Sequence, residues 1–110
     1  MRQMETDLLS GKLEELVKRI VDAVHPLKIV LFGSAARGQM GPDSDVDVLV
    51  VMPEGTHRRR TAQFLHTRML GIGMPVDILV ATDTDLKEFK DNVGLIYGTI
   101  LEEGRDVYAA

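Results

Sequence analysis

Three aspartates alternate with other residues in the segment DSDVD, residues 43–47, which leads into an apolar run ending at Met52. Successive side chains of a β-strand point to opposite faces, so Asp45 and Asp47 are expected on one face. Two carboxylates about 4 Å apart repel by roughly 4 kcal/mol at an effective dielectric constant near 20, which is comparable with the stability of a whole domain. Carboxylate oxygens suit Mg²⁺ or Mn²⁺, and such ions usually complete their coordination with water and substrate phosphates. The pattern therefore predicts a metal-dependent site for nucleotide chemistry.

A third aspartate, Asp77, interrupts the apolar segment MPVDILV, residues 74–80. About a dozen residues separate Phe32 from Asp45, which favours an antiparallel return between two strands. The connection from Met52 to Pro75 is long enough for a parallel crossover that contains a helix. These two connections would bring Asp77 to the same edge of the sheet as the first two aspartates.

A glycine and a serine stand at the end of the preceding apolar run, in the segment LFGSAARG, residues 31–38. Gly33 lets the chain turn closely, and Ser34 offers a hydroxyl and backbone N–H groups to a phosphate. Arg37 could add charge-assisted hydrogen bonds to the same phosphate, although simple exposure at a helix end explains it equally well.

Hydrophobic periodicity predicts the elements that must position these side chains. The 110 residues predict one domain, 1–110, with an α/β (α+β) fold. We expect a small mixed β-sheet packed with helices, its first two strands antiparallel and its second and third parallel. The predicted strands are Lys28–Phe32, Asp45–Met52, Val76–Val80 and a short one at Asp106–Tyr108. The predicted helices cover about residues 8–24, Thr56–Leu70, a segment starting at Asp83 or Thr84, and Leu95–Glu103.

Composition excludes several classes of site. The chain has no cysteine, which rules out disulfides and thiolate zinc sites, and its three histidines lack metal-ligand spacing. A net charge of −4 argues against direct nucleic-acid binding, which needs clustered lysines and arginines. Neither a signal peptide nor a membrane-spanning run is visible, so we expect a cytoplasmic protein.

The motifs LFGSAARG, SDVDVLV and VDILV together resemble those of the nucleotidyltransferase superfamily typified by DNA polymerase beta. They are similar in particular to the minimal nucleotidyltransferases, and the C-terminal EEGRDVY resembles that family's ending. The resemblance implies that Asp45 and Asp47 bind two metal ions and that Gly33 and Ser34 hold the triphosphate. It also implies that Asp77 joins one metal and helps to activate the attacking hydroxyl.

The function implied by this resemblance is transfer of AMP from Mg-ATP to an acceptor hydroxyl by two-metal catalysis. Minimal nucleotidyltransferases are typically paired with a helical HEPN protein, as the antitoxin of a toxin–antitoxin pair, so a tyrosine of such a partner is the implied acceptor. Two alternatives stay open: a non-catalytic nucleotide-binding module that neutralises a HEPN partner by contact, and the catalytic subunit of an aminoglycoside-type transferase. The sequence also leaves open whether the chain forms a homo-oligomer.

Two other motifs admit different interpretations. Asp43, Asp45, Asp47 and Glu54 occupy positions 1, 3, 5 and 12 of an EF-hand loop, but a valine replaces the required glycine, which disfavours calcium. The basic cluster HRRR, residues 57–60, opens a predicted helix at the end where the helix dipole disfavours cations. A solvated surface is its simplest explanation, and contact with a protein, phosphate or nucleic acid is the alternative. His66 is interpreted as an ordinary helix residue.

Overall fold

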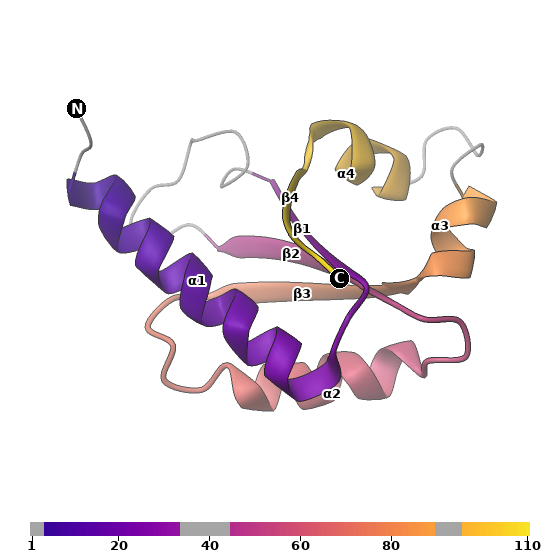
Figure 1. Cartoon of the computed structure of the whole chain (residues 1–110), viewed down its shortest axis with the longest axis horizontal. Helices are drawn as coiled ribbons and strands as arrows, with labels where there is room; N and C mark the ends of the chain where they lie inside the picture. Colours follow the sequence, from indigo (N-terminus) through magenta and orange to yellow (C-terminus); the bar gives the residue numbers. More distant parts are fainter. Residues whose placement is uncertain (1–3, 34–44, 90–95) are drawn as a thin grey trace.

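A four-stranded mixed β-sheet forms the centre of the computed structural model, which describes residues 4–33, 45–89 and 96–110 (Figure 1). The strands lie in the order β3-β2-β1-β4. Two helices cover each face of this sheet, so the predicted fold class is confirmed. In chain order the elements are α1 (Met4–Val24), β1 (Lys28–Phe32), β2 (Val46–Met52), α2 (Arg58–Arg68), β3 (Val76–Thr82), α3 (Asp83–Phe89), α4 (Ile96–Glu103) and β4 (Arg105–Ala109).

Strand pairing follows the connection lengths. The short connection joins β1 to β2 in antiparallel pairing, and the longer connection through α2 joins β2 to β3 in parallel pairing, as predicted. β4 adds to the free edge of β1 in antiparallel pairing, with an irregularity between Ile29 and Val30, and this pairing was not predicted. One boundary differs near the aspartates, because β2 begins at Val46 and Asp45 precedes it.

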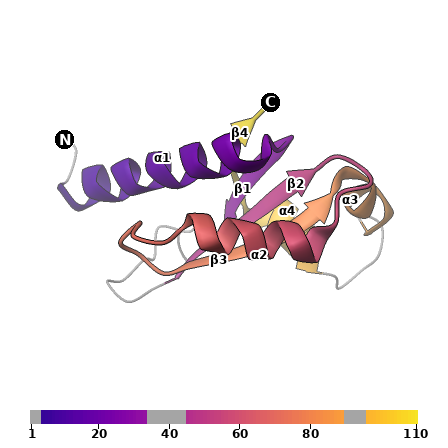
Figure 2. The same cartoon turned by 90° about the horizontal axis from the view of Figure 1, so that it is seen from below.

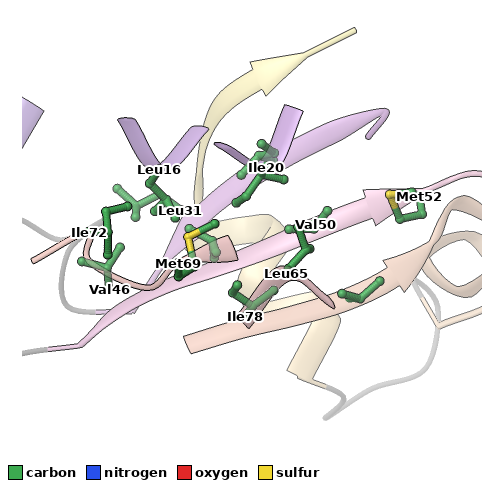
Figure 3. Packing of buried hydrophobic residues seen from close by; sticks show 13 residues of the cluster. Leu16, Ile20, Leu31, Val46, Val50, Met52, Leu65, Met69, Ile72 and Ile78 are labelled. Carbon is green, nitrogen blue, oxygen red and sulfur yellow. The ribbon is translucent and has the colours of Figure 1, made fainter. Parts of the chain in front are cut away.

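The larger core lies between the sheet and the helices α1 and α2, which lie side by side on one face (Figure 2). Leu16 and Ile20 of α1 and Leu65 of α2 are completely buried there (Figure 3). They pack on the alternate β2 residues Val46, Val48 and Val50. Burial of one such side chain contributes about 1.5–3 kcal/mol, so this face supplies most of the hydrophobic stabilisation.

Basic side chains of α1 hold the connection between α2 and β3. One guanidinium nitrogen of Arg19 donates to the carbonyl oxygens of Arg68 and Leu70, at 3.2 and 2.9 Å. The ammonium group of Lys12 donates to the carbonyl oxygen of Gly73 at 3.1 Å. Cations are favourable at the C-terminal end of a helix, where carbonyl groups lack partners. These contacts fix where β3, and with it Asp77, begins.

A smaller core lies on the other face, under α3 and α4. Leu49 and Val51 of β2, Ala81 of β3 and Ile100 of α4 form it together with Val30. None of the helices in the described part of the chain has both the length and the apolar character that a membrane crossing needs.

Gly104 allows α4 to end directly over β1. A Cβ atom at this position would overlap the carbonyl oxygen of Ile100 and lie 2.5 Å from Cγ1 of Val30. We therefore expect Gly104→Ala to lower the free energy of unfolding by about 1–3 kcal/mol, because backbone atoms are among those that would have to move. Gly98→Ala, inside α4 with no atom within 4 Å of the added Cβ, should instead stabilise by about 0.5–1 kcal/mol. Urea unfolding of both variants tests this, and equal effects would contradict the packing of α4 on β1.

Candidate active site

Asp47 and Asp77 lie directly opposite each other on the neighbouring parallel strands β2 and β3. Adjacent strands are about 4.8 Å apart, and residues in register point to the same face. Both side chains lie on the face of the smaller core, because Val46 and Val48 of β2 point into the larger core. A cavity of about 260 Å³ opens at this place, lined by Phe32, Asp47, Asp77, Ile78 and Leu79. The structure thus brings two of the three predicted carboxylates to one cavity.

The electrostatic environment of Asp47 differs from that of an exposed carboxylate. Partial burial raises the pKa of Asp47 above its ordinary value, and the negative charges of Asp77 and Asp45 raise it further. Asp45 therefore lies within electrostatic reach of Asp47, although Asp45 itself is exposed to solvent. Three acids that repel one another at the end of a buried strand are a typical feature of sites that bind a cation or transfer a proton.

Gly33 lies against the carboxylate of Asp47. Its φ of +72° is a left-handed conformation that glycine adopts without a steric penalty. A Cβ atom here would overlap Oδ2 of Asp47. The antiparallel register pairs Phe32 with Asp47, which brings the next residue, Gly33, beside the Asp47 side chain.

Two predicted site residues, Ser34 and Arg37, lie outside the described residues. Two others were missed. Phe32 and Leu79 line the cavity beside the aspartates, and both belong to the edge of the smaller core. Their positions follow from strand alternation, since Phe32 pairs with Asp47 and Leu79 is two residues after Asp77.

The donor set fits a divalent cation that keeps an open coordination shell. Within residues 4–33, 45–89 and 96–110, no group of three or more acidic or histidine side chains is placed to hold a metal ion together. A pair of carboxylates that face a cavity is nevertheless what Mg²⁺ uses in nucleotide sites, where water and phosphate oxygens supply the other ligands. Asp47 and Asp77 are therefore the side chains that could share such an ion, and Asp45 lies near enough for its charge to act on Asp47.

The basic cluster lies elsewhere. His57 caps the N-terminus of α2, and its Nδ1 accepts a hydrogen bond from the backbone N–H of Arg60 at 3.2 Å. A guanidinium nitrogen of Arg58 lies 3.2 Å from Oδ2 of Asp85, which offsets part of the unfavourable charge at this helix end. His66 is an exposed residue of α2, as the sequence indicated. Since α2 covers the opposite face of the sheet from Asp47, neither histidine lies beside the aspartates.

A comparison with protein families matches residues 10–107 to the nucleotidyltransferase domain. The chain belongs to this family. No protein with curated function matches the sequence. The family assignment gives the carboxylate pair a chemical context, since nucleotidyltransferases act on nucleoside triphosphates.

Solved structures agree on the fold of this nucleotidyltransferase. A protein from Sulfolobus solfataricus assigned as a nucleotidyltransferase has a TM-score of 0.60 at 20% identity, covering 90% of this chain and 78% of its own. A protein assigned as a minimal nucleotidyltransferase has a TM-score of 0.58 at 24% identity, with coverages of 90% and 92%. A toxin–antitoxin structure with AMP-PNP has a TM-score of 0.57 at 20% identity, with coverages of 91% and 73%.

The contact between Gly33 and Asp47 leads to a paired prediction. Gly33→Ala and Gly55→Ala both place a side chain in a left-handed conformation, at φ of +72° and +92°, which costs about 1 kcal/mol. Only Gly33→Ala also displaces the Asp47 carboxylate, because nothing lies within 4 Å of the Cβ at Gly55. We expect Gly33→Ala to lower the free energy of unfolding by about a further 1–3 kcal/mol and to shift the carboxyl NMR resonance of Asp47. Equal destabilisation with an unchanged resonance would contradict the contact.

The raised pKa of Asp47 predicts that this carboxylate lowers the stability of the metal-free protein. Its proton is bound more tightly in the folded than in the unfolded state, so the ionised form costs stability once the pH exceeds the unfolded pKa of about 3.9. Asp47→Asn should therefore raise the Tm of the protein at pH 7. The gain should shrink as the pH falls and vanish where both states are protonated.

Thermal unfolding of the two proteins between pH 4 and pH 8, in the presence of a chelator, measures this dependence. Asp22→Asn removes an exposed carboxylate of α1 and serves as the control with the same change in net charge. A gain of similar size in the control, or a gain for Asp47→Asn that grows at low pH, would show that the environment of Asp47 is not the cause.

Proposed function

We propose that this nucleotidyltransferase transfers AMP from ATP to a hydroxyl group of a partner protein. The observation that carries the proposal is the register of Asp47 with Asp77, two carboxylates that face one cavity, where burial and the charge of Asp77 raise the pKa of Asp47. The match to the nucleotidyltransferase domain supports the reaction class. ATP as the donor is supported by the similar toxin–antitoxin structure, which was solved with the ATP analogue AMP-PNP. The use of ATP in turn favours a cytoplasmic location for this protein.

The acidic residues would hold the metal ions of the proposed site, and the residues after β1 would contact the triphosphate. Asp45 and Asp47 would hold two Mg²⁺ ions, with Asp77 completing the set, and Mn²⁺ could replace them. Such ions, when bound, stabilise both the entering and the leaving oxygen of an in-line displacement at the α-phosphorus. Gly33, Ser34 and Arg37 would contact the triphosphate. Because Gly33 has no side chain, the carboxylate of Asp47 can lie directly against the backbone there.

The proposed reaction forms a bond between the acceptor oxygen and the α-phosphorus and breaks the bond from that phosphorus to the bridging oxygen of the β-phosphate. Pyrophosphate leaves with the electrons of the broken bond. The acceptor hydroxyl loses its proton as it attacks, and Asp77 is the carboxylate we assign to help remove it. Its position opposite Asp47, in the same cavity, supports this assignment.

A small helical protein of the HEPN type is the acceptor we propose, with a tyrosine as the modified residue. The support is the resemblance of the sequence to minimal nucleotidyltransferases, together with the similarity of the fold to one member of a toxin–antitoxin structure. In this arrangement the nucleotidyltransferase acts as the antitoxin. Its small sheet supplies the carboxylates of the site, and the partner supplies the hydroxyl that attacks the α-phosphorus.

Coexpression with a HEPN-type protein from the same genome tests the proposal. Intact-mass spectrometry should show the partner heavier by whole AMP units, and Asp47→Ala should reduce the rate by at least about 100-fold. Asp22→Ala, which removes an exposed carboxylate from α1, should leave the modification unchanged. An unmodified partner whose toxicity is nevertheless neutralised would overturn the transfer reaction and support neutralisation by contact.

Binding of the donor is measured separately with the purified protein. We expect ATP to bind in the presence of Mg²⁺ and to bind at least about tenfold more weakly to Asp45→Asn, because one ligand of the metal is lost. Isothermal titration with and without Mg²⁺ measures this difference. Binding that neither requires Mg²⁺ nor changes in the variant would contradict the roles assigned to the aspartates.

A further inference from the structure

The outward face of α2, by which we mean its exposed side chains Arg58, Arg59, Arg60, Phe64 and Arg68, concentrates positive charge on a protein with a net negative charge. Four of the chain's 13 basic residues lie in this helix, and none of its 17 acidic residues does. All four are arginines, and all four are exposed. Two exposed apolar side chains accompany them: Phe64 with 45% of its surface accessible, and Leu70, just beyond the helix, with 80%.

The arginines are only partly compensated within the chain. Arg58 pairs with Asp85, and the guanidinium of Arg68 lies 5.7 Å from the centre of the Phe64 ring, within the range of a cation–π contact. Among the residues that the structure describes, Arg59 and Arg60 make no ion pair. They lie in the first turn of α2, where the helix dipole makes positive charge unfavourable and where no acidic residue is present.

The composition of this face is typical of a protein interface. Arginine and aromatic residues are enriched at the centres of such interfaces and lysine is depleted, which matches a helix with four arginines, one phenylalanine and no lysine. A hollow of about 450 Å³ lies at the N-terminal end of α2, lined by Thr56, His57, Arg58 and Arg59. It could receive an acidic side chain between two guanidinium groups.

We propose that the outward face of α2 is a docking surface for a partner protein that presents carboxylates around an apolar side chain. The carboxylates would neutralise Arg59 and Arg60, and the apolar side chain would cover Phe64. A second copy of this chain is disfavoured as the occupant, because a twofold interface centred on α2 would bring arginines close to arginines. Nucleic acid is disfavoured by the net charge of −4 and by the single aromatic side chain on this face.

Docking at this surface is independent of the proposed transfer reaction. α2 packs through Leu65 and Met69 on the face of the sheet opposite Asp47, so a bound partner leaves the cavity of the aspartates open. The proposal therefore holds for a catalytic protein and for one that neutralises its partner by contact alone.

A defined peptide probe tests the proposal. Fluorescence anisotropy would measure binding of a labelled peptide in which glutamates flank a central leucine, at low ionic strength. The double variant Arg59→Glu/Arg60→Glu should bind it about tenfold more weakly, since two attractive contacts become repulsive. The same variant should melt a few degrees higher than the wild type, because acidic residues suit the first turn of a helix. Opposite changes in affinity and stability distinguish a binding surface from a structural role.

Control variants separate this surface from general electrostatic attraction. Lys18→Glu/Lys87→Glu makes the same change in net charge on α1 and α3, at two exposed lysines, and should weaken binding by less than about twofold. Phe64→Ser should weaken binding of the leucine peptide but not of a matched peptide with serine in place of leucine. This last comparison isolates the apolar part of the contact, because the charges of both peptides are identical.

Three results would overturn the proposal. The first is equal peptide affinity in the wild type and the Arg59→Glu/Arg60→Glu variant. The second is binding of labelled oligouridine tighter than binding of the peptide, which would assign the surface to nucleic acid. The third is a dimer in sedimentation equilibrium that the same variant dissociates, which would assign α2 to contact between copies of the chain. Loss of ATP binding in the Asp45→Asn variant tests the active site alone and leaves this result unaffected.

Discussion

The parallel register of β2 and β3 is the constraint on which the arrangement of the site depends. It sets Asp47 opposite Asp77, and a slip of one residue would turn Asp77 into the core under α2. A backbone hydrogen bond of 2.9 Å from Val46 to Pro75 begins this register at the site itself. The side chains of Lys12 and Arg19 hold the preceding connection by its carbonyl oxygens. α1 therefore contributes to the site through the position of β3, without contacting the aspartates.

One face of the sheet forms the larger hydrophobic core, and the other face carries the carboxylates of the candidate site. The face under α1 and α2 buries Leu16, Ile20 and Leu65 and tolerates no charge. The opposite face lies under α3 and α4, and Asp47 and Asp77 face a cavity at the end of the smaller core. Mutual repulsion there lowers the stability of the folded chain, and a cation would relieve it. Any cation bound there would thereby stabilise the folded chain.

Local patterns predicted much of this arrangement, because strand alternation and connection length act over short distances. They gave the pairing of β1 with β2 and of β2 with β3, and they placed the aspartates on one edge. They did not give the pairing of β4 with β1, because β4 is an edge strand whose residues are exposed or half-buried and show no clear alternation. Nor could they reveal that Asp85, across the sheet edge, pairs with Arg58, since no periodicity connects two residues so far apart in sequence.

The position of β3 at the edge of the sheet relates the basic helix to the acidic site. α2 packs against β3 on one face, while Asp77 projects from the same strand on the other. A partner that rests on α2 needs only to extend around this one strand to bring a hydroxyl to the cavity. The two surfaces carry opposite charge, so an acidic docking segment is attracted to α2 and repelled from the aspartates. These charges would keep the acidic docking segment of the partner away from the aspartates. The cavity would then stay free for the hydroxyl group that a different part of the partner supplies.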